Sequence, residues 1–163
     1  MLLGIAVHAQ DLRSVSGSGV EISFPAGEEM IASRMAEAAP RMLDFLREKG
    51  LPVKTPVHVF LDQDLDLPDA QVTMIPHRGV RVPLRAPGVF EEGYLEEDPW
   101  TYFLFKGLCL EGVYSIRGGL PASLHDFFGE ISSPNLINPP WLLEGITSLL
   151  YRQYRNQLTN DPF

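Results

Sequence analysis

The sequence predicts an α+β fold, in which a small mixed sheet is followed by a helical half. In the first half, short runs of alternating or β-branched residues surround one longer stretch of helical periodicity. From Pro99 onward, apolar residues recur over lengths that suit helices, between stretches that contain Pro and Gly. Strands mixed with one helix, followed by a run of helices, are typical of the α+β class.

The size and composition suit one globular domain. The chain has 163 residues, of which 45% are hydrophobic and 21% are charged, and these values are ordinary. The formal net charge of −8 argues against nucleic acid as a partner, because phosphate binding needs clustered Lys and Arg and the 13 basic residues are scattered. No apolar run approaches the roughly 20 residues that a membrane-spanning helix needs. We therefore expect neither a nucleic-acid partner nor a membrane span.

Residues 1–19 are predicted to be an N-terminal segment, and residues 20–163 a single domain. Residues 1–9 resemble the end of a signal peptide with a cut at Gln10, although the charged region that opens such a peptide is missing. An ordinary N-terminal strand is the alternative. Residues 10–19 show no core-forming pattern and are expected to be flexible. A signal peptide implies a periplasmic or secreted location. The single cysteine does not decide the location, because it is compatible with a cytoplasmic protein and with an exported one.

The first half is predicted to contain a strand, a helix and three further strands. Residues 20–24 alternate apolar and polar side chains, as strands do. The helix ends at Gly50 after a basic last turn, and its apolar residues recur at helical spacing: Ile31, Met35, Ala38, Met42 and Phe45. Pro40 is expected to kink or split this helix. The three later strands are predicted at residues 57–61, 72–75 and 80–84.

Residues 62–69 carry four acidic side chains between two of these strands. Such a group could hold calcium, but the Gly and the closing Glu of an EF-hand loop are absent. A solvated loop is therefore the preferred interpretation.

The second half is predicted to be helical. A long apolar helix runs from Pro99 to Tyr114 and is closed by a Gly-Gly pair. After a short helix over residues 121–128 and an extended loop, Pro140 fits the first turn of a final helix that ends near Arg155.

The start of the final helix resembles a known zinc helix. Residues 139–146 read Pro-Pro-Trp-Leu-Leu-Glu-Gly-Ile, and Pro-x-Trp-Leu-x-Glu-Gly is the signature of the second zinc helix of gluzincin metallopeptidases, in which the Glu is the third zinc ligand. The preceding connector, residues 118–136, resembles that of bacterial members that often precede a β-propeller. The resemblance covers roughly residues 50–155 and implies a thermolysin-like core.

The resemblance also implies that the zinc motif has been lost. In these enzymes the preceding helix carries His-Glu-x-x-His, whose two His side chains share one helix face and whose Glu activates the water. Counting back along the chain puts Lys106 at the first His, Gly107 at the Glu and Leu110 at the second His. Only Glu144, at the third ligand position, is retained. One carboxylate beside an ammonium cannot hold a catalytic zinc, so we expect no metal and no other cofactor.

Two interpretations of Glu144 remain open. Lys106 could take the place of the metal and form a salt bridge with Glu144, because both positions should point into the former metal site. Alternatively, Glu144 makes only a local hydrogen bond or cap. A rebuilt zinc site would have to use Cys109, Glu111 or His125, and the first two do not share the helix face of Lys106.

Other conspicuous side chains are expected to be structural. Trp100 and Trp141 are predicted to anchor the core. Cys109, on an apolar helix, is predicted to be a small buried hydrophobe and not a nucleophile. His58 is expected to be packed or to lie at an edge of its strand.

What remains of the implied enzyme is its substrate cleft, where an edge strand beside the zinc helix binds extended peptides by strand addition. Val80, Arg81 and Val82 are the candidate, because Pro83 cannot donate to a ladder and such a proline is typical of an edge strand. The resemblance thus implies a non-catalytic module that binds or scaffolds an extended peptide or a protein. The alternatives are a zinc-dependent peptidase with a rearranged metal site and an N-terminal fragment of a larger propeller-containing protein.

Overall fold

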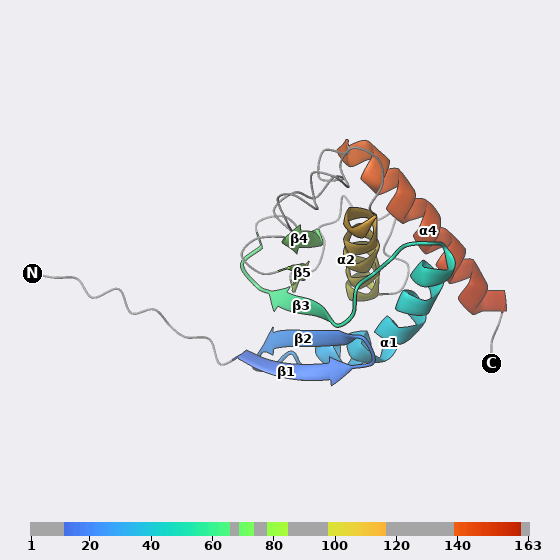
Figure 1. Ribbon diagram of the computed structural model, residues 1–163. Helices are drawn as coiled ribbons and strands as arrows, with labels where there is room; N and C mark the ends of the chain where they lie inside the picture. The colour runs from blue at the N-terminus through green and yellow to red at the C-terminus, as the bar shows by residue number, and fades with distance from the viewer. Residues whose placement is uncertain (1–11, 66–68, 74–77, 85–97, 117–138, 161–163) are drawn as a thin grey trace, which may run out of the picture.

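A five-stranded mixed sheet forms one layer of the protein, and three helices are described with it (Figure 1). The computed structural model describes residues 12–65, 69–73, 78–84, 98–116 and 139–160. The strands are β1 (Leu12–Gly17), β2 (Val20–Pro25), β3 (Val57–Asp62), β4 (Gln71–Thr73) and β5 (Gly79–Pro83), and the helices are α1 (Glu29–Glu48), α2 (Pro99–Ser115) and α4 (Pro140–Asn160). This composition confirms the predicted α+β class.

The sheet has the strand order β1-β2-β3-β5-β4. Strand β3 runs parallel to both β2 and β5, whereas β1 and β4, at the two ends, are antiparallel to their neighbours. In β3, Val57, Val59 and Leu61 are buried while His58 and Phe60 are exposed, which is the alternation of a sheet with one covered face. Helix α1 covers β1 and β2, and helix α2 covers β5 and β4.

The N-terminal end of the sheet corrects one expectation. Residues 12–17, expected to be flexible, form strand β1 and pair with β2 along their whole length. Gly17 pairs with Val20, so Ser18 and Gly19 make the hairpin turn, and Gly19 has a left-handed φ of 92° that favours glycine. The polar composition of β1 concealed the strand, because an edge strand with mostly exposed side chains needs few apolar residues.

The sequence predicted a kink or a split at Pro40, and a split is wrong because helix α1 continues through this residue. Pro40 has no N–H to donate to the carbonyl oxygen of Ala36, one turn earlier. That oxygen faces β1, because a Cβ added to Gly17 would lie 3.0 Å from it. Tertiary packing holds the helix together across the proline, through buried residues on both sides of it: Ala32, Met35, Ala39, Met42, Leu43, Phe45 and Leu46.

Helix α2 is enclosed on every side, and all residues from Tyr102 to Val113 are buried. Helices α1 and α4 and strands β4 and β5 contact it, which explains why apolar residues lie on all of its sides, with Lys106 and Glu111 as the two charged exceptions. Its first turn is capped by the Asp98 carboxylate, which accepts hydrogen bonds from Trp100 N (3.2 Å) and Thr101 Oγ1 (2.8 Å). An aromatic cluster fills the space between the three helices: Phe45, Tyr102, Phe105, Tyr151 and Tyr154.

The other predicted elements are confirmed with shifted ends. The strands expected in the first half are β2, β3, β4 and β5, and the two long helices of the second half are α2 and α4. Helix α4 continues to Asn160, beyond its predicted end near Arg155. The short helix predicted at residues 121–128 lies outside the described residues.

Gly107 marks a very close approach of α2 to the sheet. A Cβ added to Gly107 would lie 2.2 Å from Val80 Cγ1. Valine has few rotamers, and Val80 is fully buried in β5 between two paired neighbours. A side chain at position 107 would therefore push α2 away from β5.

Gly107→Ala should destabilise the protein by about 1–3 kcal/mol, because the added methyl group over-packs the contact between α2 and β5. Urea unfolding measures this loss. The matched control is Gly107→Ala/Val80→Ala, in which the opposing methyl groups are also removed. If the double variant loses the full sum of the two single losses, the predicted steric conflict does not exist.

Candidate functional site

Lys106, in the middle of α2, carries a buried ammonium group whose side chain is 7% exposed. Its Nζ donates hydrogen bonds to Asp69 Oδ2 at 2.9 Å and to Glu144 Oε1 at 2.5 Å. Asp69 comes just before β4, and Glu144 lies in the first turns of α4. We name Asp69, Lys106 and Glu144 the Lys106 cluster. The cluster joins three segments that are far apart in the sequence.

The predicted salt bridge between Lys106 and Glu144 is confirmed. The alternative that Glu144 makes only local contacts is wrong. Asp69 is the member that the sequence does not indicate, because the acidic residues 62–69 predict a solvated loop. Its side chain is 44% exposed, and 37 positions separate it from Lys106, so no local pattern could have linked the two residues.

The cluster keeps Lys106 charged. Burial by itself would lower the pKa of the ammonium, but the hydrogen bonds to Glu144 and Asp69 outweigh burial and raise this pKa above its usual 10.5. A lysine serves as a base or a nucleophile only when its pKa falls toward neutrality. Lys106 is therefore a fixed cation at neutral pH, and its single positive charge is shared by two carboxylates.

Gly107 and Leu110, which the resemblance aligns with two residues of the zinc motif, have no side chain that could bind a metal or act as a base. Gly107 has no side chain and faces Val80, where a carboxylate would not fit. Leu110, one turn after Lys106, is buried. Within the described ranges, no three His, Cys, Asp or Glu side chains come close enough together to hold a metal ion.

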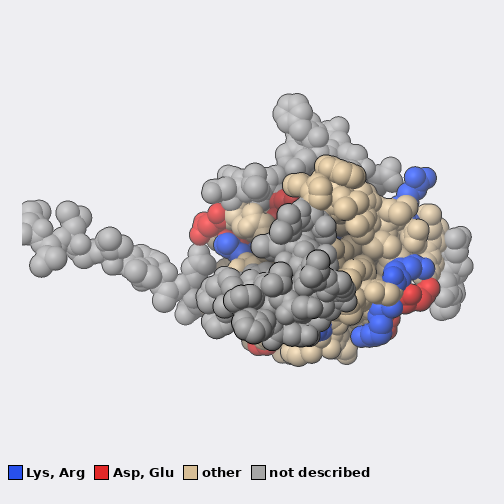
Figure 2. All heavy atoms as spheres, turned by 45° about the horizontal axis from the view of Figure 1, so that its top comes forward, with Lys and Arg blue, Asp and Glu red and all other residues tan. Residues whose placement is uncertain are grey.

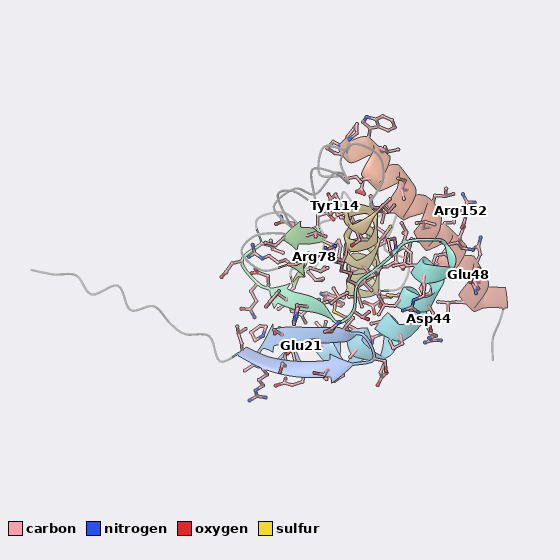
Figure 3. All side chains as sticks on the ribbon, viewed as in Figure 1. Glu21, Asp44, Glu48, Arg78, Tyr114 and Arg152 are labelled. Carbon is pink, nitrogen blue, oxygen red and sulfur yellow. The ribbon has the colours of Figure 1, made fainter. Side chains whose placement is uncertain are left out.

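Two residues considered for a rebuilt zinc site have other partners. Thr147 Oγ1 donates to Cys109 Sγ at 3.8 Å, and burial raises the pKa of the Cys109 thiol to about 11 despite that hydrogen bond. Cys109 is thus the small buried side chain that the sequence predicted, and the raised pKa keeps its thiol protonated at neutral pH. Glu111 is buried and forms a salt bridge with Arg78, which lies beside α2 at the start of β5 (Figure 3). His125 lies outside the described residues.

The strand expected to bind peptides is not at an edge of the sheet. Val80, Arg81 and Val82 belong to β5, which pairs with β3 on one side and with β4 on the other. Pro83 misled the prediction, because it is the last residue of β5, where a missing N–H costs the sheet little. Among the described strands, the edge on this side is β4, and Asp69 of the Lys106 cluster lies two residues before that strand.

Trp141 also differs from the prediction. Its side chain is 73% exposed, so it does not anchor the core, whereas Trp100 is partly buried and packs against the core as expected. Trp141 lies on the outer side of α4, whose inner side carries Leu143. On the open face of the sheet, His58 Nδ1 lies 3.2 Å from a carboxylate oxygen of Glu21.

Charged side chains are unevenly distributed over the described surface. On the face in Figure 2, basic side chains gather mainly at one margin beside acidic ones, and most of the described surface between is uncharged. None of the described helices is long and apolar enough to cross a membrane.

No family model, curated protein or solved structure matches the chain. The predicted signal peptide lies outside the described residues.

Removing both carboxylates of the Lys106 cluster should destabilise the fold by about 3 kcal/mol. Asp69→Ala/Glu144→Ala leaves a buried ammonium without a counter-charge, and a broken buried pair costs about 3–5 kcal/mol. We expect the lower end of that range because both carboxylates are about half exposed. Each single substitution should cost less, since one carboxylate remains. Urea unfolding of the three variants measures these losses.

The matched control adds Lys106→Met to the double variant. Methionine keeps an unbranched apolar stem without a charge, so the triple variant should recover most of the lost stability. A triple variant that is as unstable as the double variant would show that the unpaired ammonium is not the cause.

The raised pKa of Lys106 also predicts a pH dependence. A group whose pKa is raised by folding stabilises the folded state fully below its unfolded pKa, near 10.5, and loses that contribution as the pH rises through the folded value. Unfolding free energies of the native protein and of Lys106→Met should therefore converge or cross in favour of Lys106→Met above pH 10.5. The variant carries the same tyrosines and other lysines, so their titration cancels. A difference that stays constant with pH would contradict the prediction.

Proposed function

We propose that this chain is a gluzincin-like domain that binds an extended peptide and does not hydrolyse it. The Lys106 cluster carries the proposal. An ammonium lies against Glu144, the position of the third zinc ligand, and is held there by a second carboxylate from Asp69. A catalytic zinc needs three protein ligands and an open position, and a fixed cation at this point repels another.

The strand order supports a gluzincin-like core. Strand β4 ends the sheet, runs antiparallel to β5 and contacts α2, the helix that aligns with the zinc helix. In this superfamily an edge strand beside the zinc helix receives the peptide. That role falls to β4 in this chain, because β5 is paired on both sides.

The chemistry at β4 suits binding without cleavage. An edge strand offers backbone N–H and C=O groups to which an extended peptide can add as a further strand. Hydrolysis would require a base to activate water, and Gly107, at the position of that base, has no side chain and no space for one. The residues Gln71–Thr73 of β4 are all partly exposed, and the Lys106 cluster lies at the start of the strand.

Peptides from a casein digest should bind at β4 and remain intact. We expect the largest NMR amide shifts at Gln71–Thr73, and mass spectrometry should recover the peptides uncut. A tight-binding peptide should then lose affinity when alternate residues are N-methylated, because strand addition uses every second N–H of the peptide. Methylation of the intervening residues is the matched control and should have little effect.

Two results would overturn the proposal. One is a set of amide shifts at β1, the other edge of the sheet, with none at β4. The other is stoichiometric zinc in the purified protein that is lost in Glu144→Ala, together with peptide cleavage, which would favour the alternative of a peptidase with a rearranged metal site.

A further inference from the structure

Helix α4 carries apolar side chains on two opposite faces. On one face, Leu143 and Tyr154 pack against the core. On the other, Trp141 and Leu149 have side chains that are 73% and 58% exposed. The outer face of a surface helix is normally polar. The packing of the chain's own core therefore does not account for this exposed pair.

The two exposed side chains lie symmetrically about Gly145. Trp141 is four residues before Gly145 and Leu149 is four residues after it. At about 100° per residue, the three positions fall within about 80° of the helix circumference, with Gly145 in the middle. We name Trp141, Gly145 and Leu149 the α4 stripe. Arg152, which lies at the same side of the helix, points away from the rest of the molecule (Figure 3).

No contact in the described part of the chain requires a glycine at position 145. A Cβ at this position would have no heavy atom within 4 Å, so no neighbour requires the residue to be small. Glycine inside a helix is less favourable than alanine. A glycine is useful at such a point when a second backbone has to come close.

We propose that the α4 stripe packs on the α4 stripe of a second copy of this chain, as an antiparallel helix pair with its twofold axis at Gly145. Such an axis places Trp141 of each copy on Leu149 of the other, because both residues are equally far from Gly145. One symmetric contact thus covers all four exposed apolar side chains. This self-complementary spacing favours a second copy over a partner of another sequence.

The charge of α4 is compatible with a second copy of the chain as the partner. The whole chain has a net charge of −8, so two copies repel each other in general. Helix α4 carries two basic residues, Arg152 and Arg155, and one acidic residue, Glu144, which gives a sum of +1. Glu144 is also paired with Lys106. The contact therefore brings together two helices of low net charge, which adds little to the general repulsion between the copies. The stripe is small, so the dimer is weak and depends on concentration.

Sedimentation equilibrium of the full chain tests the proposal and does not depend on peptide binding. The native protein should pass from monomer to dimer as its concentration rises. Trp141→Glu, Leu149→Lys and Gly145→Gln should each remain monomeric while keeping the native circular dichroism spectrum, because all three positions are exposed. The matched control is Met30→Ser on α1, a side chain that is 75% exposed, and this variant should dimerise like the native protein.

A mixture of two variants tests the antiparallel geometry. Equimolar Trp141→Glu and Leu149→Lys should form a heterodimer, because one Trp–Leu contact remains and the other becomes a Glu–Lys pair. A parallel pair would place Glu against Trp and Lys against Leu. A native protein that stays monomeric to its solubility limit, single variants that still dimerise, or a mixture that does not associate would overturn the proposal.

Discussion

The burial of one ammonium group is the constraint on which the arrangement of the second half depends. Lys106 lies in a largely apolar helix whose one other charged residue is Glu111, and a buried charge is tolerated only with close counter-charges. Asp69 and Glu144 supply them from two other segments. The Lys106 ammonium therefore fixes where the start of β4 and the first turns of α4 lie relative to α2. It also keeps β4 beside α2.

Close packing on two sides holds α2 against its neighbours. Gly107 brings the helix onto Val80 of β5, and an added Cβ on Gly112 would lie 3.0 Å from Leu51 Cβ, in the segment after α1. Two missing side chains on different sides thus let the helix sink between its neighbours. At these two positions the neighbouring side chains of Val80 and Leu51 occupy the space that a longer side chain on α2 would need.

Sequence patterns predicted what depends on local periodicity. The alternation in β3 and the apolar spacing of α1 and α2 gave the right elements. The Trp-Leu-x-Glu-Gly segment led to the predicted pair of Lys106 and Glu144, and that contact is present. Strand order could not be predicted in this way. Pro83 indicated an edge, yet the neighbours of β5 are set by pairing with distant strands. Asp69 was missed for the same reason, because its partner lies in another element. The polar strand β1 carried too few apolar residues to be seen, and Trp141 resembled a core residue although α4 turns it outward.

The close contacts at positions 106 and 107 restrict which side chains these two neighbouring positions of α2 can carry. A glutamate at position 107 would drive a carboxylate into Val80, and a neutral histidine at position 106 would leave Asp69 and Glu144 without their cation. Each substitution alone would therefore give a less stable protein. A metal-binding pair of side chains could be introduced here only together with changes on β5 and around Asp69, so the packing of the helix protects the present chemistry of the site against single substitutions.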